Sequence, residues 1–112
     1  MTVRFTDAFK RQLERLSRRY RRIRADVQPI IDRLVAGETP GNRIQAGQHI
    51  LYKVRVKNTD AGRGTRGGFR IIYYLLDADD VLLLTIYSKS DQGDISVAEL
   101  RRMIADEDHR TP

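Results

Sequence analysis

Five side chains suited to phosphate chemistry fall within one stretch of this 112-residue chain: Lys53, Arg55, Arg70, Tyr87 and Lys89. Arginine binds phosphate oxygens through paired hydrogen bonds and stabilises the extra negative charge of a phosphate under attack. A lysine crowded by other cations loses its proton more easily and can act as base or acid, and a tyrosine can donate a proton or stack on a base. The set predicts a phosphate-binding surface, and with it phosphodiester cleavage.

The other common catalytic sets are missing from the sequence. The chain has no cysteine, and its two histidines, His49 and His109, have no triad partners. No His, Asp or Glu spacing predicts a metal site, so we expect neither a metal nor another cofactor. The chemistry left is metal-free RNA cleavage, in which a 2′-hydroxyl attacks the adjacent phosphorus and the 5′-oxygen leaves.

The charge is unevenly distributed along the chain. Residues 1–76 hold 17 Lys and Arg against 6 Asp and Glu, a net of +11, whereas residues 77–112 hold 4 against 9, a net of −5; the two add to the formal +6. This asymmetry indicates a polyanion or an acidic partner. A solvated, arginine-rich helical face without a partner would give the same charge distribution. No apolar run is long enough to span a bilayer and no signal-peptide pattern is present, so we expect a soluble cytoplasmic protein without a membrane partner.

The order of elements predicts an α+β fold in a single domain, residues 1–112, with an antiparallel sheet of three to four strands. Thr6 is a helix N-cap before a stripe of apolar residues, and Asp26 is predicted to cap a second helix that ends at Gly37. The two helices should form a hairpin. Alternation of Val3 and Phe5 with polar residues allows a short strand before the first helix. Residues 37–48 are predicted to be a loop.

Three strands are then predicted at about 49–57, 68–76 and 81–88, because apolar and β-branched residues dominate these segments. Ser96 and Glu99 form a capping box that starts a final helix. The polar segment 106–112 is predicted to be a frayed tail. Helices should cover one face of the sheet and leave the other partly open.

Strand pairing brings the five side chains together. If the two hairpins turn near residues 62–63 and 78–79, Arg55 lies opposite Arg70, and Arg70 lies opposite residue 87 or 88. A slip of one residue would exchange Tyr87 and Lys89 for Ser88 on that face. Such like charges repel unless an anion, or acidic neighbours such as Asp77 and Asp91, offsets them.

The loop between the first two of these strands is rich in glycine and arginine. Arg63 and Arg66 lie among its glycines, and Lys57 precedes it on the basic face of the strand. Glycines let a backbone approach a phosphate closely. We therefore expect Lys57, Arg63 and Arg66 to bind RNA. The loop contains no GxxxxGK[ST] pattern, so it is not a P-loop.

The motifs YKVRVKN, GRGTRGGFRIIYYL and LLTIYSKSDQGDIS resemble the RelE/ParE superfamily of toxins from type II toxin–antitoxin modules, and most closely its RelE/HigB-like branch. The resemblance implies a RelE-like fold and an mRNA endonuclease acting in the ribosomal A site. It also implies a cognate antitoxin that binds and neutralises the toxin, and we expect the two to form a hetero-oligomer. The resemblance implies catalytic roles for Lys53, Arg55, Arg70 and Lys89.

The chain departs from the RelE pattern at two points. Ser90 stands where an arginine is expected, and residues 93–112 contain no tyrosine; Tyr87, and Arg63 or Arg66, are candidates to replace them. Two other functions remain open. One is the ParE-like activity of the superfamily, inhibition of DNA gyrase by protein contact, and the other is non-catalytic RNA binding.

Overall fold

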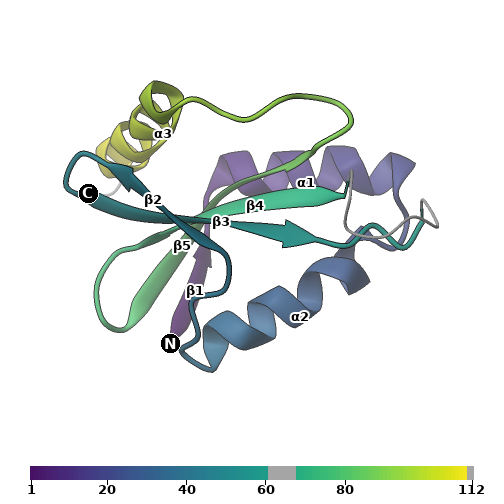
Figure 1. Ribbon diagram of the computed structural model, residues 1–112, viewed down its shortest axis with the longest axis horizontal. Coiled ribbons are helices and arrows are strands. Elements are labelled where there is room, and N and C mark those ends of the chain that lie inside the picture. The colour runs from purple at the N-terminus through teal and green to yellow at the C-terminus, as the bar shows by residue number, and fades with distance from the viewer. Residues whose placement is uncertain (61–67, 111–112) are drawn as a thin grey trace.

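Five strands and three helices make up the part of the chain that the computed structural model describes, residues 1–60 and 68–110 (Figure 1). The elements, in chain order, are β1 Thr2–Phe5, α1 Asp7–Arg19, α2 Ile23–Val35, β2 Asn42–Ala46, β3 His49–Val56, β4 Phe69–Leu75, β5 Asp80–Ser88 and α3 Val97–Arg110. The sheet order is β1-β5-β4-β3-β2. The pairs from β2 to β5 are antiparallel and β1 runs parallel to β5, so the α+β class is confirmed but the sheet is mixed and has five strands.

Helices α1 and α2 cover one face of the sheet. They run in opposite directions and spread apart from their connection at residues 20–22 (Figure 1). Thr6 caps α1 as predicted, because its hydroxyl accepts a hydrogen bond from the backbone N–H of Phe9 and donates one to the carbonyl of Leu84 in β5. The predicted apolar stripe of α1 and α2 packs on alternate residues of β3, β4 and β5.

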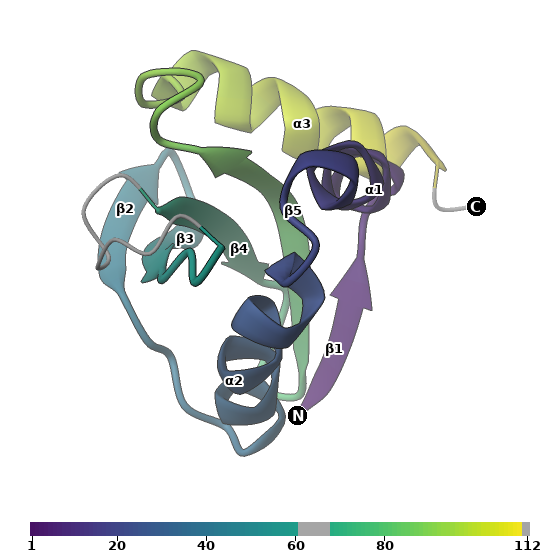
Figure 2. The same cartoon turned by 90° about the vertical axis from the view of Figure 1, so that its right-hand side faces the viewer.

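Helix α3 lies over the other face of the sheet, across the ends of the strands away from the α1–α2 connection (Figure 2). Leu100 and Ile104 pack there against Leu51, Ile72 and Leu82. Ser96 caps the helix by accepting a hydrogen bond from the N–H of Glu99. The prediction that helices cover only one face of the sheet is therefore wrong, because α3 packs on the other face.

Three boundaries were predicted wrongly. Helix α2 begins at Ile23 rather than at Asp26, so Asp26 lies in its first turn and Pro29 lies inside it. The predicted loop 37–48 contains β2, an edge strand paired with β3. The predicted frayed tail is wrong as far as Arg110, because α3 continues to that residue.

Gly41 shows why β2 can lie so close to β3. Its φ is +100°, and a Cβ placed on it would lie 2.4 Å from the carbonyl oxygen of Lys53. Only glycine fits this approach without moving a backbone. The loop before it is fixed by Tyr73, whose hydroxyl donates a hydrogen bond to the carbonyl of Pro40.

Candidate functional site

Arg55, Arg70 and Tyr87 form one row across three neighbouring strands. In the register of the sheet, Arg55 in β3 lies directly opposite Arg70 in β4, and Arg70 lies directly opposite Tyr87 in β5. Residues directly opposite in an antiparallel pair project from the same face. The predicted pairing is therefore confirmed, and the alternative with Ser88 on this face is wrong, because Ser88 lies opposite Phe69.

The row lies on the same face of the sheet as α3. The next row inward consists of Lys53, Ile72 and Thr85, and the row beyond it contains Leu51, which packs under α3. We call Lys53, Arg55, Arg70 and Lys89 the cationic cluster.

Arg70 is the buried member of the cationic cluster, with 6% of its surface exposed, whereas Arg55 is exposed. The Arg70 guanidinium donates a hydrogen bond to the carbonyl of Phe69, 3.1 Å away. Among the described residues, no carboxylate lies within 4.0 Å of the Arg55 or Arg70 guanidinium. A buried cation next to a like charge is costly unless an anion compensates it.

The two lysines of the cationic cluster are brought together by Asp94. Lys89 Nζ lies 3.0 Å and Lys53 Nζ 3.4 Å from the same oxygen, Asp94 Oδ1. The Tyr87 hydroxyl donates to that oxygen as well, over 3.4 Å. Hydrogen bonds from Lys89 and Lys53 hold the pKa of Asp94 below its ordinary value. Three donors from β3, β5 and the segment after β5 therefore converge on one anionic oxygen.

Tyr87 stays protonated at neutral pH. Burial raises the pKa of its hydroxyl above the ordinary value, and the charge and hydrogen bond of Asp94 raise it further, against a smaller lowering by Arg70. Its ring is almost fully buried, with 2% exposed. In this position Tyr87 can donate a proton but is a poor base.

The segment that carries Lys89 and Asp94 is fixed at both ends. Asp91 and Gln92 donate backbone hydrogen bonds to the carbonyl of Ser88, and Asp91 also pairs with Arg19 of α1 at 3.1 Å. Ser96 then begins α3. Between these two points Asp94 has a side chain that is 56% exposed.

The remaining predicted residues differ in what the structure says of them. Lys57 is exposed just beyond β3, whereas Arg63 and Arg66 lie outside the described residues. His49 contacts Tyr74 at the opposite end of β3 from Arg55, with 3.0 Å between its Nδ1 and the tyrosine hydroxyl. Of the two proposed counter-ions, Asp91 pairs with Arg19, and Asp77 accepts backbone hydrogen bonds in the β4–β5 turn. Asp94, which takes that role, was missed.

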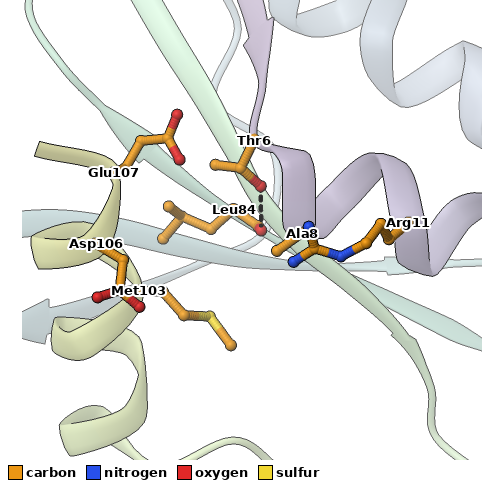
Figure 3. Close-up of a pocket in the computed structure, with 7 residues that line it drawn as sticks. All are labelled: Thr6, Ala8, Arg11, Leu84, Met103, Asp106 and Glu107. Atoms are coloured by element: carbon orange, nitrogen blue, oxygen red, sulfur yellow. Dashed lines mark hydrogen bonds between the residues drawn. The ribbon is translucent and has the colours of Figure 1, made fainter. Parts of the chain in front are cut away.

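No metal centre accompanies the cationic cluster in the described part of the chain. No three His, Asp or Glu side chains of residues 1–60 and 68–110 are arranged to hold a metal ion. A small pocket of about 80 Å³ lies between the start of α1 and the end of α3 (Figure 3). It is lined by Thr6, Ala8, Arg11, Leu84, Met103, Asp106 and Glu107, none of which belongs to the cluster. A space this small is well below the usual size of a ligand site.

The described structure is a twisted sheet between a helical hairpin and a C-terminal helix, with cations gathered at one end of the sheet. Residues 3–93 match the family described as ParE toxin of type II toxin-antitoxin system, parDE, and the chain belongs to this family. The predicted superfamily is thereby confirmed, and membership implies a cognate antitoxin as partner. No helix in the described ranges is both long enough and apolar enough to cross a membrane.

Proposed function

We propose that this toxin is a ribosome-dependent mRNA endonuclease of the RelE/HigB-like type. The observation that carries the proposal is Arg70, a buried arginine that faces Arg55 across the strands and has no carboxylate at ion-pair distance among the described residues. A phosphate bound beside the two guanidiniums would offset their repulsion and accept bidentate hydrogen bonds.

The proposed reaction uses only side chains of the chain. The 2′-oxygen of one nucleotide bonds to the adjacent phosphorus as its proton passes to a base, and the bond to the 5′-oxygen breaks, leaving a 2′,3′-cyclic phosphate and a 5′-hydroxyl. Arg55 and Arg70 stabilise the charge that builds up on the phosphate. Tyr87, held protonated by its surroundings, gives its proton to the leaving 5′-oxygen. Lys53 and Lys89 complete the site as base and electrostatic partner.

The proposed reaction depends on a substrate that is aligned with the cationic cluster. Arg55 is exposed and Lys53 and Lys89 are partly exposed, whereas Arg70 is buried, so an RNA strand must be held close against the sheet to reach all four. A ribosome that presents mRNA in a fixed conformation would supply the alignment that the toxin lacks. This is why we place the activity in the ribosomal A site of a cytoplasmic ribosome.

Arg55→Ala and Arg70→Ala test the proposal. Each should lower mRNA cleavage by about 10²–10³-fold, the usual effect of removing one donor to a developing oxyanion, and the double variant should no longer inhibit growth. Cleavage is measured by primer extension on mRNA in a translation extract, where codon-aligned cuts are expected. Thermal unfolding would establish that the variants are folded, and Arg70→Lys, which keeps the charge but loses the bidentate geometry, should fall between wild type and Arg70→Ala.

Arg43→Ala is the matched control. Arg43 is an exposed arginine of the same sheet, opposite Tyr52 in β3, and projects from the face covered by α1 and α2. Its removal changes the net charge equally and should leave cleavage intact. If the double variant Arg55→Ala/Arg70→Ala is folded and still toxic, the nuclease proposal is wrong.

Inhibition of DNA gyrase is the second candidate, and the family match to ParE toxins favours it. It needs no converging cations, so the cluster weighs against it. Uncut mRNA together with impaired supercoiling by purified gyrase would establish this function. RNA binding without either effect would leave the third candidate, a non-catalytic RNA-binding module.

The same cations give a proposal for the antitoxin. We expect an acidic antitoxin segment to cover the cationic cluster or to displace α3 from the sheet. Either position would block RNA from the site. A toxin–antitoxin complex that leaves both the cluster and α3 untouched would contradict this expectation.

A further inference from the structure

Asp94 occupies the point at which the phosphate-handling side chains converge. Its Oδ1 is shared by Lys89 Nζ at 3.0 Å, Lys53 Nζ at 3.4 Å and the Tyr87 hydroxyl at 3.4 Å. A non-bridging phosphate oxygen bound by the same groups would need this arrangement of donors. One carboxylate oxygen therefore stands where the substrate's anionic oxygen is expected.

The contacts of Asp94 suit a group that can leave. Two of the three are long for hydrogen bonds, and the Asp94 side chain is 56% exposed, so it can turn into solvent without burying or stranding a charge. The backbone on either side is held separately, by the turn at Ser88 and by the cap of α3 at Ser96. The side chain can thus move while the segment stays in place.

We propose that Asp94 is an internal counter-anion, which holds Lys53, Lys89 and Tyr87 together in the free toxin and is displaced by a phosphate of the substrate. This inference deepens the proposed function, on which it rests for the identity of the phosphate as RNA. Asp94 acts through the two lysines and the tyrosine, and is a positioning residue rather than a catalytic one. It keeps cations that would otherwise repel one another in the geometry that a phosphate needs.

Competition between Asp94 and phosphate for the same donors has a direct consequence for the affinity of the toxin for anions. Because a phosphate must replace Asp94, removing the Asp94 charge should tighten anion binding, whereas a merely structural residue would weaken binding when removed. Asp94→Asn should bind inorganic phosphate, and a 2′-O-methyl RNA oligonucleotide that cannot be cleaved, roughly tenfold more tightly than wild type. Asp94→Glu, which restores the charge, should return the affinity to near the wild-type value.

Asp91→Asn is the matched control. Asp91 lies in the same segment and its removal raises the net charge equally, but its partner is Arg19, at 3.1 Å. We expect its affinity for phosphate to stay within about twofold of wild type, since long-range effects of an exposed charge are small. Tightening in both variants would mean that net charge alone governs binding, and would overturn the proposal.

NMR titration with inorganic phosphate provides the measurement, and it also tests the wild-type protein. Phosphate should shift the Asp94 carboxyl carbon together with the Lys89 side-chain signals. If the Lys89 signals move and the Asp94 carbon does not, or if folded Asp94→Asn binds phosphate no more tightly than wild type, the proposal fails. The two proposals can be told apart. The Asp94 proposal can fail although the toxin cuts mRNA, and it can hold although the toxin is not a nuclease.

Discussion

Tyr87 combines a buried ring with a hydroxyl at the edge of the cationic cluster. The ring is 2% exposed, and the hydroxyl reaches Asp94 over 3.4 Å. Because burial raises the pKa of the hydroxyl, the proton is present throughout the neutral range. A residue of this kind is a proton donor whose position is set by packing rather than by a mobile side chain.

Tyr87→Phe separates these two properties. The ring remains to fill the space beside Ile72 and Leu84, so the free energy of unfolding should change by only about 1 kcal/mol. Loss of the proton donor should lower mRNA cleavage by about 10²-fold or more in the primer-extension assay. Tyr52→Phe, on the opposite face, is the control and should cleave normally; wild-type cleavage by Tyr87→Phe would remove the acid role from this residue.

Sequence was more informative about the cationic residues than about their anionic partner. Arg55, Arg70 and Tyr87 could be aligned because strand alternation and hairpin length fix a local register. Asp94 was not predicted because it lies outside the strands, where no periodicity shows that its side chain turns back to Lys89, five residues earlier, or to Lys53, 41 residues earlier. An excess of like charge at one level of a sheet was the available signal that a carboxylate had to lie nearby.

At the scale of elements, the start of α2 holds the chain where it leaves β3. The Asp26 carboxylate accepts hydrogen bonds from the backbone N–H and the hydroxyl of Thr59, at 3.0 and 2.7 Å. The Asp60 carboxylate in turn accepts one from the backbone N–H of Arg22, at 2.7 Å. The helical connection is thereby fastened to the strand that carries Lys53 and Arg55.

Asp26→Ala should release this attachment. The Thr59 amide should exchange its hydrogen about tenfold faster, and the free energy of unfolding should fall by about 1–2 kcal/mol, because two hydrogen bonds to a charged group are lost. Cleavage should fall as the end of β3 loosens. Asp32→Ala is the control, since Asp32 on the same helix accepts only an exposed hydrogen bond from Gln28 among those described; equal exchange in both variants would count against the attachment.

Non-local contacts explain two of the errors in the predicted boundaries. Asp26 looked like an N-cap, yet it is used 33 residues away by Thr59, and α2 starts without a side-chain cap at Arg22. Strand β2 is a short polar segment that Pro40, Gly41 and Gly47 surround, a pattern that predicts a loop. Its place is set by pairing with β3, which a local pattern does not reveal.

For the molecule as a whole, buried tyrosines link stability to alkaline pH. Tyr73 is fully buried, and burial, followed by the neighbouring Tyr52, raises the pKa of its hydroxyl, against a small lowering by Arg33. The folded pKa of Tyr73, like that of Tyr87, lies above the unfolded value of about 10. Their contribution to stability is therefore complete below pH 10, and it is lost as the pH rises toward the folded pKa.

Urea unfolding as a function of pH tests this linkage. The free energy of unfolding should be flat with respect to these groups near neutrality and should fall above about pH 10. Tyr73→Phe should be less stable at pH 7 by about 1 kcal/mol, because the hydrogen bond to Pro40 is lost, but its stability should fall less steeply above pH 10. Parallel pH curves for the two proteins would show that Tyr73 is not responsible.

The pairing of β1 with β5 has a consequence for how the toxin is made. Residues 2–5 of β1 find their partners only when residues 80–83, much later in the chain, have been made. The cationic cluster waits equally long, because Lys89 and its counter-ion Asp94 come later still. A growing chain therefore carries no complete cationic cluster until these late residues have been made. For the proposed nuclease, this order would keep the translating ribosome from meeting a complete site until Asp94 has been added.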